Sequence, residues 1–359
     1  RASDRLTRYD GNLTGLALAS PADPTSELVA SATGLERWAR CPFDHFMRSV
    51  LGVGKVENPE DSPTITPLER GSLVHLVLER FVEEVLERPE GQRPGPTDRW
   101  TAADRARLQE IGAEECDRVH SLGLTGRTLY WSRDRAAILA DLDATLDFDD
   151  RMRAANGSHL LHAELGFGFG DDALPAVPLP LPDGRQVRFR GQIDRVDRTS
   201  TGLLVADYKT GGIRAYKGLG PDNPDQGGTH LQLAVYGAAA RAAAGLPDAE
   251  VRAEYWFVSS KGGFDHLGYV LTPEISERIS ETLGLIVDGI EAGVFPAHPT
   301  DQQGAPFNPC WSCDPDFLGV ADLRRSWERK AGDPTMAGYL TLIDPERRLP
   351  GDDEGDDDG

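Results

Sequence analysis

Two aspartates and a lysine lie close together in the stretch GQIDRVDRTSTGLLVADYKTGG, residues 191–212. Asp194 is near the end of one predicted strand, and Asp207 and Lys209 are at the end of the next. Side chains alternate between the faces of a strand, so Asp207 and Lys209 should point the same way. A tight turn would bring Asp194 beside Asp207, and a hard cation such as Mg²⁺ would relieve the repulsion between the carboxylates. The Lys209 ammonium could then orient or deprotonate a water, or neutralise charge on a phosphoryl group.

The competing interpretation is a solvated hairpin on which Asp207 and Lys209 form an exposed ion pair. Two features of the sequence favour a functional site instead. The apolar residues Leu203, Leu204 and Val205 lead directly to Asp207, which indicates a buried strand, and a Gly-Gly turn follows Lys209.

Two predicted helices carry further polar side chains at regular spacing. His75 lies among apolar residues, with Gly71 one turn before it and Glu79 one turn after it on the same face. Taken alone, a histidine in such a helix is more often a core residue than a ligand. Gln232 and Tyr236 are four residues apart on one face of an otherwise apolar helix, which ordinary packing would explain equally well.

The order of these elements resembles the RecB-type branch of the PD-(D/E)XK nucleases. That branch includes the nuclease modules of the RecBCD and AddAB helicase–nucleases and the CRISPR adaptation nucleases. The resemblance covers about residues 31–330. It rests on four ordered motifs: Gly71-xxx-His75-xx-Leu78-Glu79, Gly191-xx-Asp194-Arg195-x-Asp197, Asp207-Tyr208-Lys209-Thr210-Gly211 and Gln232-Leu233-xx-Tyr236.

The resemblance implies a role for each matched residue. It makes His75, Asp194 and Asp207 the metal ligands and Lys209 the catalytic lysine, with Asp194 and Asp207 also counted as catalytic. Four further residues would support the site or touch DNA: Gln232, Tyr236, Arg195 and Glu164, the last from the preceding strand.

The same branch often carries an iron–sulfur cluster held by one N-terminal and three C-terminal cysteines. Cys41, followed by proline, fits the first position, and Cys310 and Cys313 fit the next two. The fourth position is Gly319, so a four-cysteine cluster cannot form as the family builds it. Cys116 has an unrelated context and is predicted to be an ordinary buried thiol.

Three alternatives therefore stay open for this cluster. Three thiolates could hold an incomplete cluster, Asp314 or Asp316 could replace the missing ligand, or the site could be vestigial. In each case Cys41 should lie close to Cys310 and Cys313, although about 270 residues separate them.

Charge and composition limit the classes of protein that fit. The formal charge of the 359 residues is −21, which argues against a generally DNA-binding surface. The stretch from Arg185 to Lys217, however, contains eight basic and three acidic residues, a local net charge of +5 that would suit a phosphate backbone. No apolar run approaches the ~20 residues of a membrane span, and no signal peptide is evident. Four cysteines are too few for a disulfide framework, so a cytoplasmic location is predicted.

The pattern of elements predicts the fold class. Helices are expected at 31–50 (broken at Pro42), 66–88, 101–120, 132–154, 229–245, 273–292 and 320–330. Strands are expected at 160–169, 186–197, 202–208, 251–258 and 265–271. This order indicates an α/β protein with a central mixed sheet flanked by helices. The resemblance implies a restriction-endonuclease-like core with a large helical insertion before the core strands.

We expect one nuclease domain, residues 31–335, between two other segments. Residues 1–30 are predicted as a connector and 336–359 as an acidic tail. Within the domain, 66–155 is the helical part, 158–292 the catalytic core and 293–335 a cysteine-containing loop. The chain begins with Arg1 rather than Met, which suggests a piece of a longer protein.

The resulting hypothesis is a Mg²⁺- or Mn²⁺-dependent deoxyribonuclease, with an exonuclease favoured over an endonuclease. It would be the C-terminal module of a helicase–nuclease in double-strand break repair and recombination. Its partners would be DNA and a helicase subunit or linked helicase domain. The alternatives are an inactive DNA-binding or scaffold module, and a stand-alone exonuclease of the CRISPR-adaptation kind.

Overall fold

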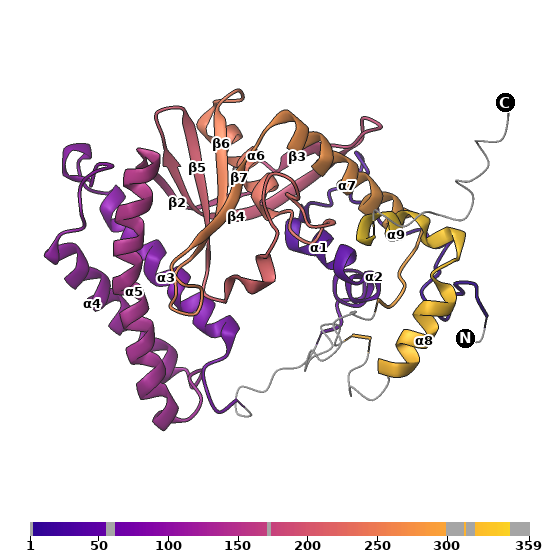
Figure 1. The fold of residues 1–359 in the computed structure, drawn as a ribbon, viewed down its shortest axis with the longest axis horizontal. Helices are drawn as coiled ribbons and strands as arrows, with labels where there is room; N and C mark the ends of the chain where they lie inside the picture. The colour runs from indigo at the N-terminus through magenta and orange to yellow at the C-terminus, as the bar shows by residue number, and fades with distance from the viewer. Residues whose placement is uncertain (1–2, 55–61, 171–173, 299–311, 314–319, 345–359) are drawn as a thin grey trace, which may run out of the picture.

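A mixed β-sheet forms the centre of the protein (Figure 1). The structure is a computed structural model that describes residues 3–54, 62–170, 174–298, 312–313 and 320–344. The strands of the sheet are β1 (Ala30–Ser31), β2 (His159–Phe167), β3 (Val177–Pro180), β4 (Gln186–Arg198), β5 (Gly202–Lys209), β6 (Glu250–Phe257) and β7 (His266–Val270). The main strand order is β1-β4-β5-β6-β7, and β2 and β3 also pair with β4.

The long strand β4 joins two parts of this sheet. Its first half pairs with β1 in parallel and with β3 antiparallel, while its second half lies between β2 and β5, both antiparallel. β5 and β6 are parallel neighbours, and such a pair needs a crossover connection. Helix α6 (Gln232–Ala244) lies in that connection, which places its first residues near the carboxyl end of β5.

Helices cover both faces of the sheet, which confirms the predicted fold class. On one face lie α3 (Pro67–Leu86), α4 (Ala102–Ser121) and α5 (Thr128–Asn156). On the other face α6 packs with α1 (Ala32–Arg40), α7 (Pro273–Glu291) and α9 (Ala337–Ile343). Helices α2 (Pro42–His45) and α8 (Val320–Lys330) complete the longer set, and single helical turns span Phe46–Val50, Glu90–Gln92, Ile213–Tyr216 and Pro334–Met336.

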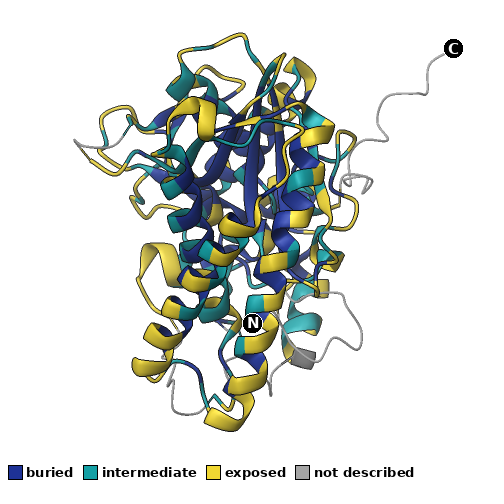
Figure 2. Ribbon diagram, turned by 90° about the vertical axis from the view of Figure 1, so that its left-hand side faces the viewer, coloured by how far each residue is buried: buried dark blue, intermediate teal, exposed yellow. Residues whose placement is uncertain are grey.

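Strand β5 shows why the sheet is buried on both faces. Leu203 and Val205 belong to the core under α1, α6 and α7, whereas Leu204 and Ala206 belong to the core under α3, α4 and α5. This alternation follows from the two-residue period of a strand. The central strands β5 and β6 are almost continuously buried, and Figure 2 shows this buried layer inside the protein.

Helix α3 has clear local signals for its start. The Thr66 hydroxyl accepts a hydrogen bond from the Glu69 amide, and Pro67 occupies the first helical position. One face of α3 carries buried Leu73, Val74 and Val77, so the helix is anchored against the sheet. His75, on the same turn, is held at a fixed place relative to the strands.

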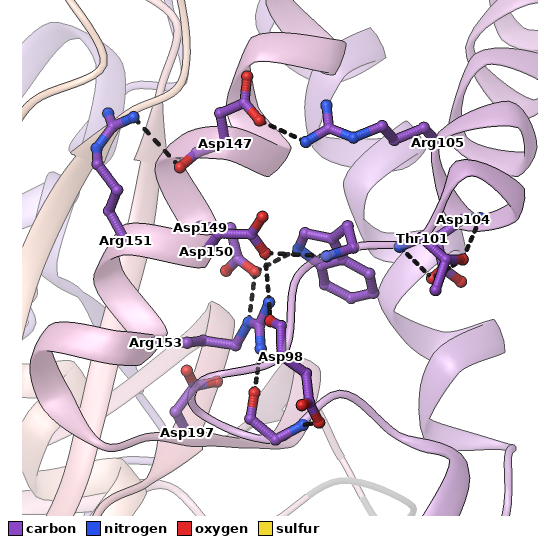
Figure 3. Close-up of polar contacts among 12 residues, drawn as sticks. Asp98, Thr101, Asp104, Arg105, Asp147, Asp149, Asp150, Arg151, Arg153 and Asp197 are labelled. Atoms are coloured by element: carbon purple, nitrogen blue, oxygen red, sulfur yellow. Dashed lines mark hydrogen bonds and ion pairs between the residues drawn. The ribbon is translucent and has the colours of Figure 1, made fainter.

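A buried ionic network ties α5 to β4. Figure 3 shows the part of this network around Arg153 of α5. Arg195 of β4 pairs with Asp149 of α5 and with Asp197 of its own strand. Arg153 pairs with Asp149 at 2.8 Å and with Asp150 at 2.6 Å. Buried charges need such partners, since an unpaired charge would lose its solvation without compensation. The helical part between α3 and the core strands is therefore locked to the strand that carries Asp194.

Several segments differ from the prediction in informative ways. Strand β3 is absent from the prediction because Pro178 and Pro180 disfavour a strand, but a strand that pairs with β4 at the sheet margin tolerates them. The first residues of the predicted tail form α9, whose Tyr339 and Leu340 are buried in the core. Within the ranges that the structure describes, no helix is both long and apolar enough to cross a membrane.

The predicted connector packs against the C-terminal helices. The Lys330 ammonium donates hydrogen bonds to the carbonyls of Ser3 and Arg5 and forms an ion pair with Asp10 at 3.0 Å. Leu6 is buried, and its amide donates to Asp333 at 2.6 Å. The described segment from Ser3 to Asp10 therefore lies beside α8, in the region that Figure 1 shows next to the C-terminal helices.

Candidate functional site

His75 and Asp194 meet at the backbone of Tyr208. The Nδ1 atom of His75 is 3.1 Å from Asp194 Oδ1, and its Nε2 atom is 3.0 Å from the Tyr208 carbonyl oxygen. The Tyr208 amide donates to Asp194 Oδ2 at 2.5 Å. Both neighbours of the imidazole are acceptors, so this arrangement places a proton on each ring nitrogen.

The divergence of β4 from β5 explains this arrangement. The ladder between them ends at the Arg195–Ala206 pair, so Tyr208, two residues further along, has no β4 partner for its backbone. The Asp194 carboxylate accepts from its N–H, and the His75 imidazole donates to its C=O. Side chains thus complete the hydrogen bonding that the sheet leaves open, as a buried backbone requires.

Glu164 joins the same group from β2. The register pairs Ala163 with Arg195 and Leu165 with Ile193, so Glu164 lies opposite Asp194. One ligand atom from each of three residues lies within 4.8 Å of the others: His75, Glu164 and Asp194. Glu164 has a φ of 44°, in the left-handed region that a non-glycine residue rarely adopts, and such strain is concentrated at functional sites.

Asp207 and Lys209 form an ion pair next to this group, as strand alternation predicts. Asp207 is buried, and its charge interacts with that of Asp194. It is not a member of the group of three residues whose ligand atoms lie within 4.8 Å of one another. Its Oδ2 atom is instead directed to the Lys209 ammonium. Lys209 is also 3.3 Å from Gln232 Oε1, and its ammonium lies 4.8 Å from the centre of the Tyr255 ring.

Helix α6 presents Gln232 and Tyr236 to this lysine. Gln232 Nε2 donates to the Tyr236 hydroxyl at 3.4 Å, so the two side chains act as one polar unit between Lys209 and the helix. Glu36 of α1 holds the start of this helix, since its Oε1 accepts from the Leu231 and Gln232 amides at 2.7 and 3.2 Å. This role of Glu36 is not evident from the sequence, where a lone acid beside an apolar leucine is its only signal.

Burial and the charges of neighbouring acids disfavour negative charge on Glu164 and Asp207. Burial, with the charges of Asp194 and Glu79, raises the pKa of Glu164 to about 8. Burial raises the pKa of Asp207 to about 6, although the Lys209 ammonium opposes that shift. A cation placed among these groups would favour their charged forms.

Electrostatics act in the opposite sense on the two basic groups. Burial alone would lower the pKa of His75, but the hydrogen bond and charge of Asp194 outweigh it and raise the pKa. Burial also opposes the charge of Lys209, yet Asp207 raises its pKa above the ordinary value. Lys209 therefore remains an ammonium, and the site pairs protonated bases with crowded carboxyl groups.

These residues fit a divalent cation. Two carboxylates and an imidazole from three different elements converge within a few ångströms, and carboxylate oxygens are the ligands that Mg²⁺ prefers. Burial, followed by the charge of Asp194, raises the pKa values of Glu164 and Asp207, and a cation bound here would offset both effects. The donor set is thus chemically suited to Mg²⁺ or Mn²⁺.

The basic stretch from Arg185 to Lys217 does not act as one positive surface. Arg195 is only 3% exposed and is occupied by Asp149 and Asp197, so it supports the fold around Asp194. Arg185 pairs with three acids at the surface, and Arg188 donates to two backbone carbonyls. Much of the local positive charge is therefore paired with acidic or carbonyl groups of the protein itself.

Two of the singled-out cysteines lie together. The sulfur atoms of Cys41 and Cys313 are 3.3 Å apart, although 272 residues separate them in sequence. Cys310 and Gly319 lie outside the described residues, so the expected three-thiol cluster stays a prediction. Cys116 is buried in α4 far from this contact in sequence, and burial raises the pKa of its thiol to about 11.

Comparison with known proteins gives a consistent picture. A family model described as PD-(D/E)XK nuclease superfamily matches residues 29–315. The chain is 30% identical over 281 residues to a protein of Desulforudis audaxviator named as a subunit of an ATP-dependent helicase/deoxyribonuclease, which covers 73% of this chain and 22% of that protein. It is 30% identical over 193 residues to the protein of the same name from Lacticaseibacillus casei, covering 51% and 15%. The chain thus spans less than a quarter of these relatives.

Proposed function

The chain belongs to the PD-(D/E)XK nuclease superfamily, and on that premise we propose that it is a metal-dependent deoxyribonuclease module. The observation that carries this proposal is the convergence of His75, Glu164 and Asp194 beside the Asp207–Lys209 ion pair. The relatives named helicase/deoxyribonuclease support DNA as the substrate.

The chemistry follows from what each side chain can do. A bound Mg²⁺ or Mn²⁺ would polarise the scissile phosphate and lower the pKa of a water nearby. Asp194, Asp207 and His75 would hold that ion, with Glu164 as a further ligand from β2. To ligate it, His75 would give up the proton on one ring nitrogen, which the bound cation would replace. Lys209 keeps its proton and adds positive charge beside the phosphate, while Gln232 and Tyr236 restrain its position.

The cellular setting is part of the same proposal. Because relatives of this chain are much longer proteins named as helicase/deoxyribonuclease subunits, we place the module in a helicase–nuclease with a helicase subunit or a linked helicase domain as its partner. Such an assembly would act in double-strand break repair and recombination. Exonucleolytic cleavage is the expected mode, and product lengths on end-labelled DNA would test it.

Cleavage of labelled single- and double-stranded DNA, with Mg²⁺, with Mn²⁺ or with a chelator, tests the activity. We expect cleavage only with metal, and a loss on the order of 10²–10³ in rate for Asp207→Ala or Lys209→Ala. Asp147→Ala is a matched control, because this aspartate is exposed on α5 and pairs with Arg105. A parent protein that never cuts, or an Asp207→Ala variant that cuts like the parent, would contradict the proposal.

A further inference from the structure

A pocket of about 370 Å³ lies directly beside Gln232 and Tyr236. It is bordered by the start of α1 at Ala32, by β4 at Arg190 and by Phe169 just after β2. Its volume falls in the range of roughly 300–1,000 Å³ that is typical of small-ligand sites. Since Gln232 also contacts Lys209, one side chain separates this pocket from the candidate catalytic lysine.

The chain holds an aromatic ring over this pocket. Phe169 is 57% exposed, although burial of a phenylalanine is normally favourable. It stands between Gly168 and Gly170, which have φ values of 74° and 114°. A Cβ on Gly168 would come within 2.7 Å of the Arg190 Cβ, so only glycine allows this close approach. The backbone is therefore built to place Phe169 beside Arg190.

Arg190 contributes a positive charge that has no acidic partner among the described residues. Its guanidinium lies 5.9 Å from the centre of the Phe169 ring, and it makes no hydrogen bond or ion pair with any described residue. By contrast, Arg188 on the same strand donates hydrogen bonds to backbone carbonyls, and Arg195 forms ion pairs with carboxylates. An exposed arginine with no polar partner among the residues that the structure describes is well suited to an external anion.

We propose that Phe169, Arg190 and the adjoining pocket form a nucleotide subsite for single-stranded DNA. A base stacks on the Phe169 ring, Arg190 binds a flanking phosphate, and the strand passes Tyr236 and Gln232 toward Lys209. Single-stranded bases offer free faces for stacking, whereas bases of a duplex are covered by their neighbours unless one is flipped out. The DNA substrate rests on the proposed function, and the binding subsite extends it.

Equilibrium binding without metal tests the subsite separately from catalysis. The probe is a fluorescein-labelled oligothymidylate, followed by anisotropy in the presence of a chelator so that no cleavage occurs. Phe169→Ala should weaken binding roughly 5- to 100-fold without changing its salt dependence. Arg190→Ala should reduce the slope of log K against log salt by about 0.7, the value for one lost single-strand phosphate contact. Phe169→Tyr keeps an aromatic ring and should restore binding.

Two control variants match these changes. Arg198→Ala removes an exposed arginine at the other end of β4 that likewise has no polar partner among the described residues. Leu129→Ala removes an apolar side chain that is 82% exposed at the start of α5. Both should bind the oligothymidylate like the parent, and a blunt duplex should bind Phe169→Ala and the parent equally.

The outcomes separate the two proposals. Loss of oligothymidylate binding in Phe169→Ala and Arg190→Ala alone supports the subsite, even if no DNA is ever cleaved with Mg²⁺. Parent-like affinity of Phe169→Ala overturns the subsite, even if Asp207→Ala shows that the nuclease is real. An equal loss in Arg198→Ala also overturns it, because binding would then depend only on overall charge.

Discussion

Glu36 of α1 accepts a hydrogen bond from the backbone amide of Leu231, 195 residues further along the chain, at 2.7 Å and thereby caps helix α6. α6 has no side-chain cap of its own at Leu231. Glu36 is buried, and Arg40 is 3.2 Å from its Oε2 atom. A carboxylate at a helix N-terminus interacts favourably with the free amides there. Glu36 thus fixes the residue that contacts Lys209, Gln232.

The first prediction follows from this contact. Glu36→Ala should leave the start of α6 uncapped and let Gln232 shift away from Lys209, which lowers the cleavage rate by up to roughly 10²-fold. Glu36→Gln keeps an acceptor oxygen and should restore part of that loss. Thr101→Ala, which removes the cap of the distant helix α4, is the control. It should lose about 1 kcal/mol of stability and keep its cleavage rate. Equal rates for Glu36→Ala and Thr101→Ala would contradict the positioning role.

The second prediction concerns the buried network of Asp149, Arg153 and Arg195, of which Figure 3 shows the Asp149–Arg153 part. Asp149→Ala would leave Arg153 and Arg195 with one partner fewer in an environment closed to water. Removing one member of a buried ion pair costs about 3–5 kcal/mol. Asp147→Ala breaks an exposed pair two residues earlier and should cost no more than about 1 kcal/mol. Urea unfolding measures both values, and similar midpoints for the two variants would argue against the network.

The third prediction links metal binding to pH. The folded pKa of Glu164, about 8, lies above its ordinary value of about 4.3, so the metal-free fold binds this proton more tightly than the unfolded chain does. Stability from this group is present below the ordinary pKa and is lost as pH rises toward 8. A divalent cation stabilises the charged form and replaces protons on the site. The rise in melting temperature on adding Mg²⁺ should therefore be larger at pH 8 than at about pH 5.

The variant Glu164→Gln provides the control for this pH dependence. It removes the titrating group while keeping the size of the side chain, so metal-free stability should change less between about pH 5 and pH 8. Thermal melts of both proteins with and without Mg²⁺ give the comparison. A parent protein whose Mg²⁺-induced shift is the same at both pH values would contradict the assignment.

The fourth prediction uses His230, which packs against Tyr216 and lies just before α6. Burial, with the charges of Arg40 and Lys209, lowers its pKa to about 4, below the ordinary value of about 6.5. The folded protein thus binds this proton less tightly than the unfolded chain. Its contribution is complete above about pH 6.5 and is lost as pH falls toward 4. His230→Phe should therefore lose less stability than the parent over that interval, as measured by urea unfolding at each pH.

Local patterns in the sequence predicted much of what surrounds the candidate site. The spacing of Asp207 and Lys209 determined that both side chains share a face of β5, because the period of a strand is a local property. Apolar periodicity likewise predicted the helix that carries His75. Such features depend on neighbours within a few residues, so they can be inferred without the rest of the chain.

The tertiary structure alone decided which distant groups face one another. Glu164 lies opposite Asp194 through the register of β2 and β4, and a shift of one residue would have turned its side chain to the other face. Glu36 reaches α6, and Phe169 reaches Arg190, only because the sheet brings separate elements together. The local sequence determines which side chains an element presents, whereas packing and strand register determine which of them meet.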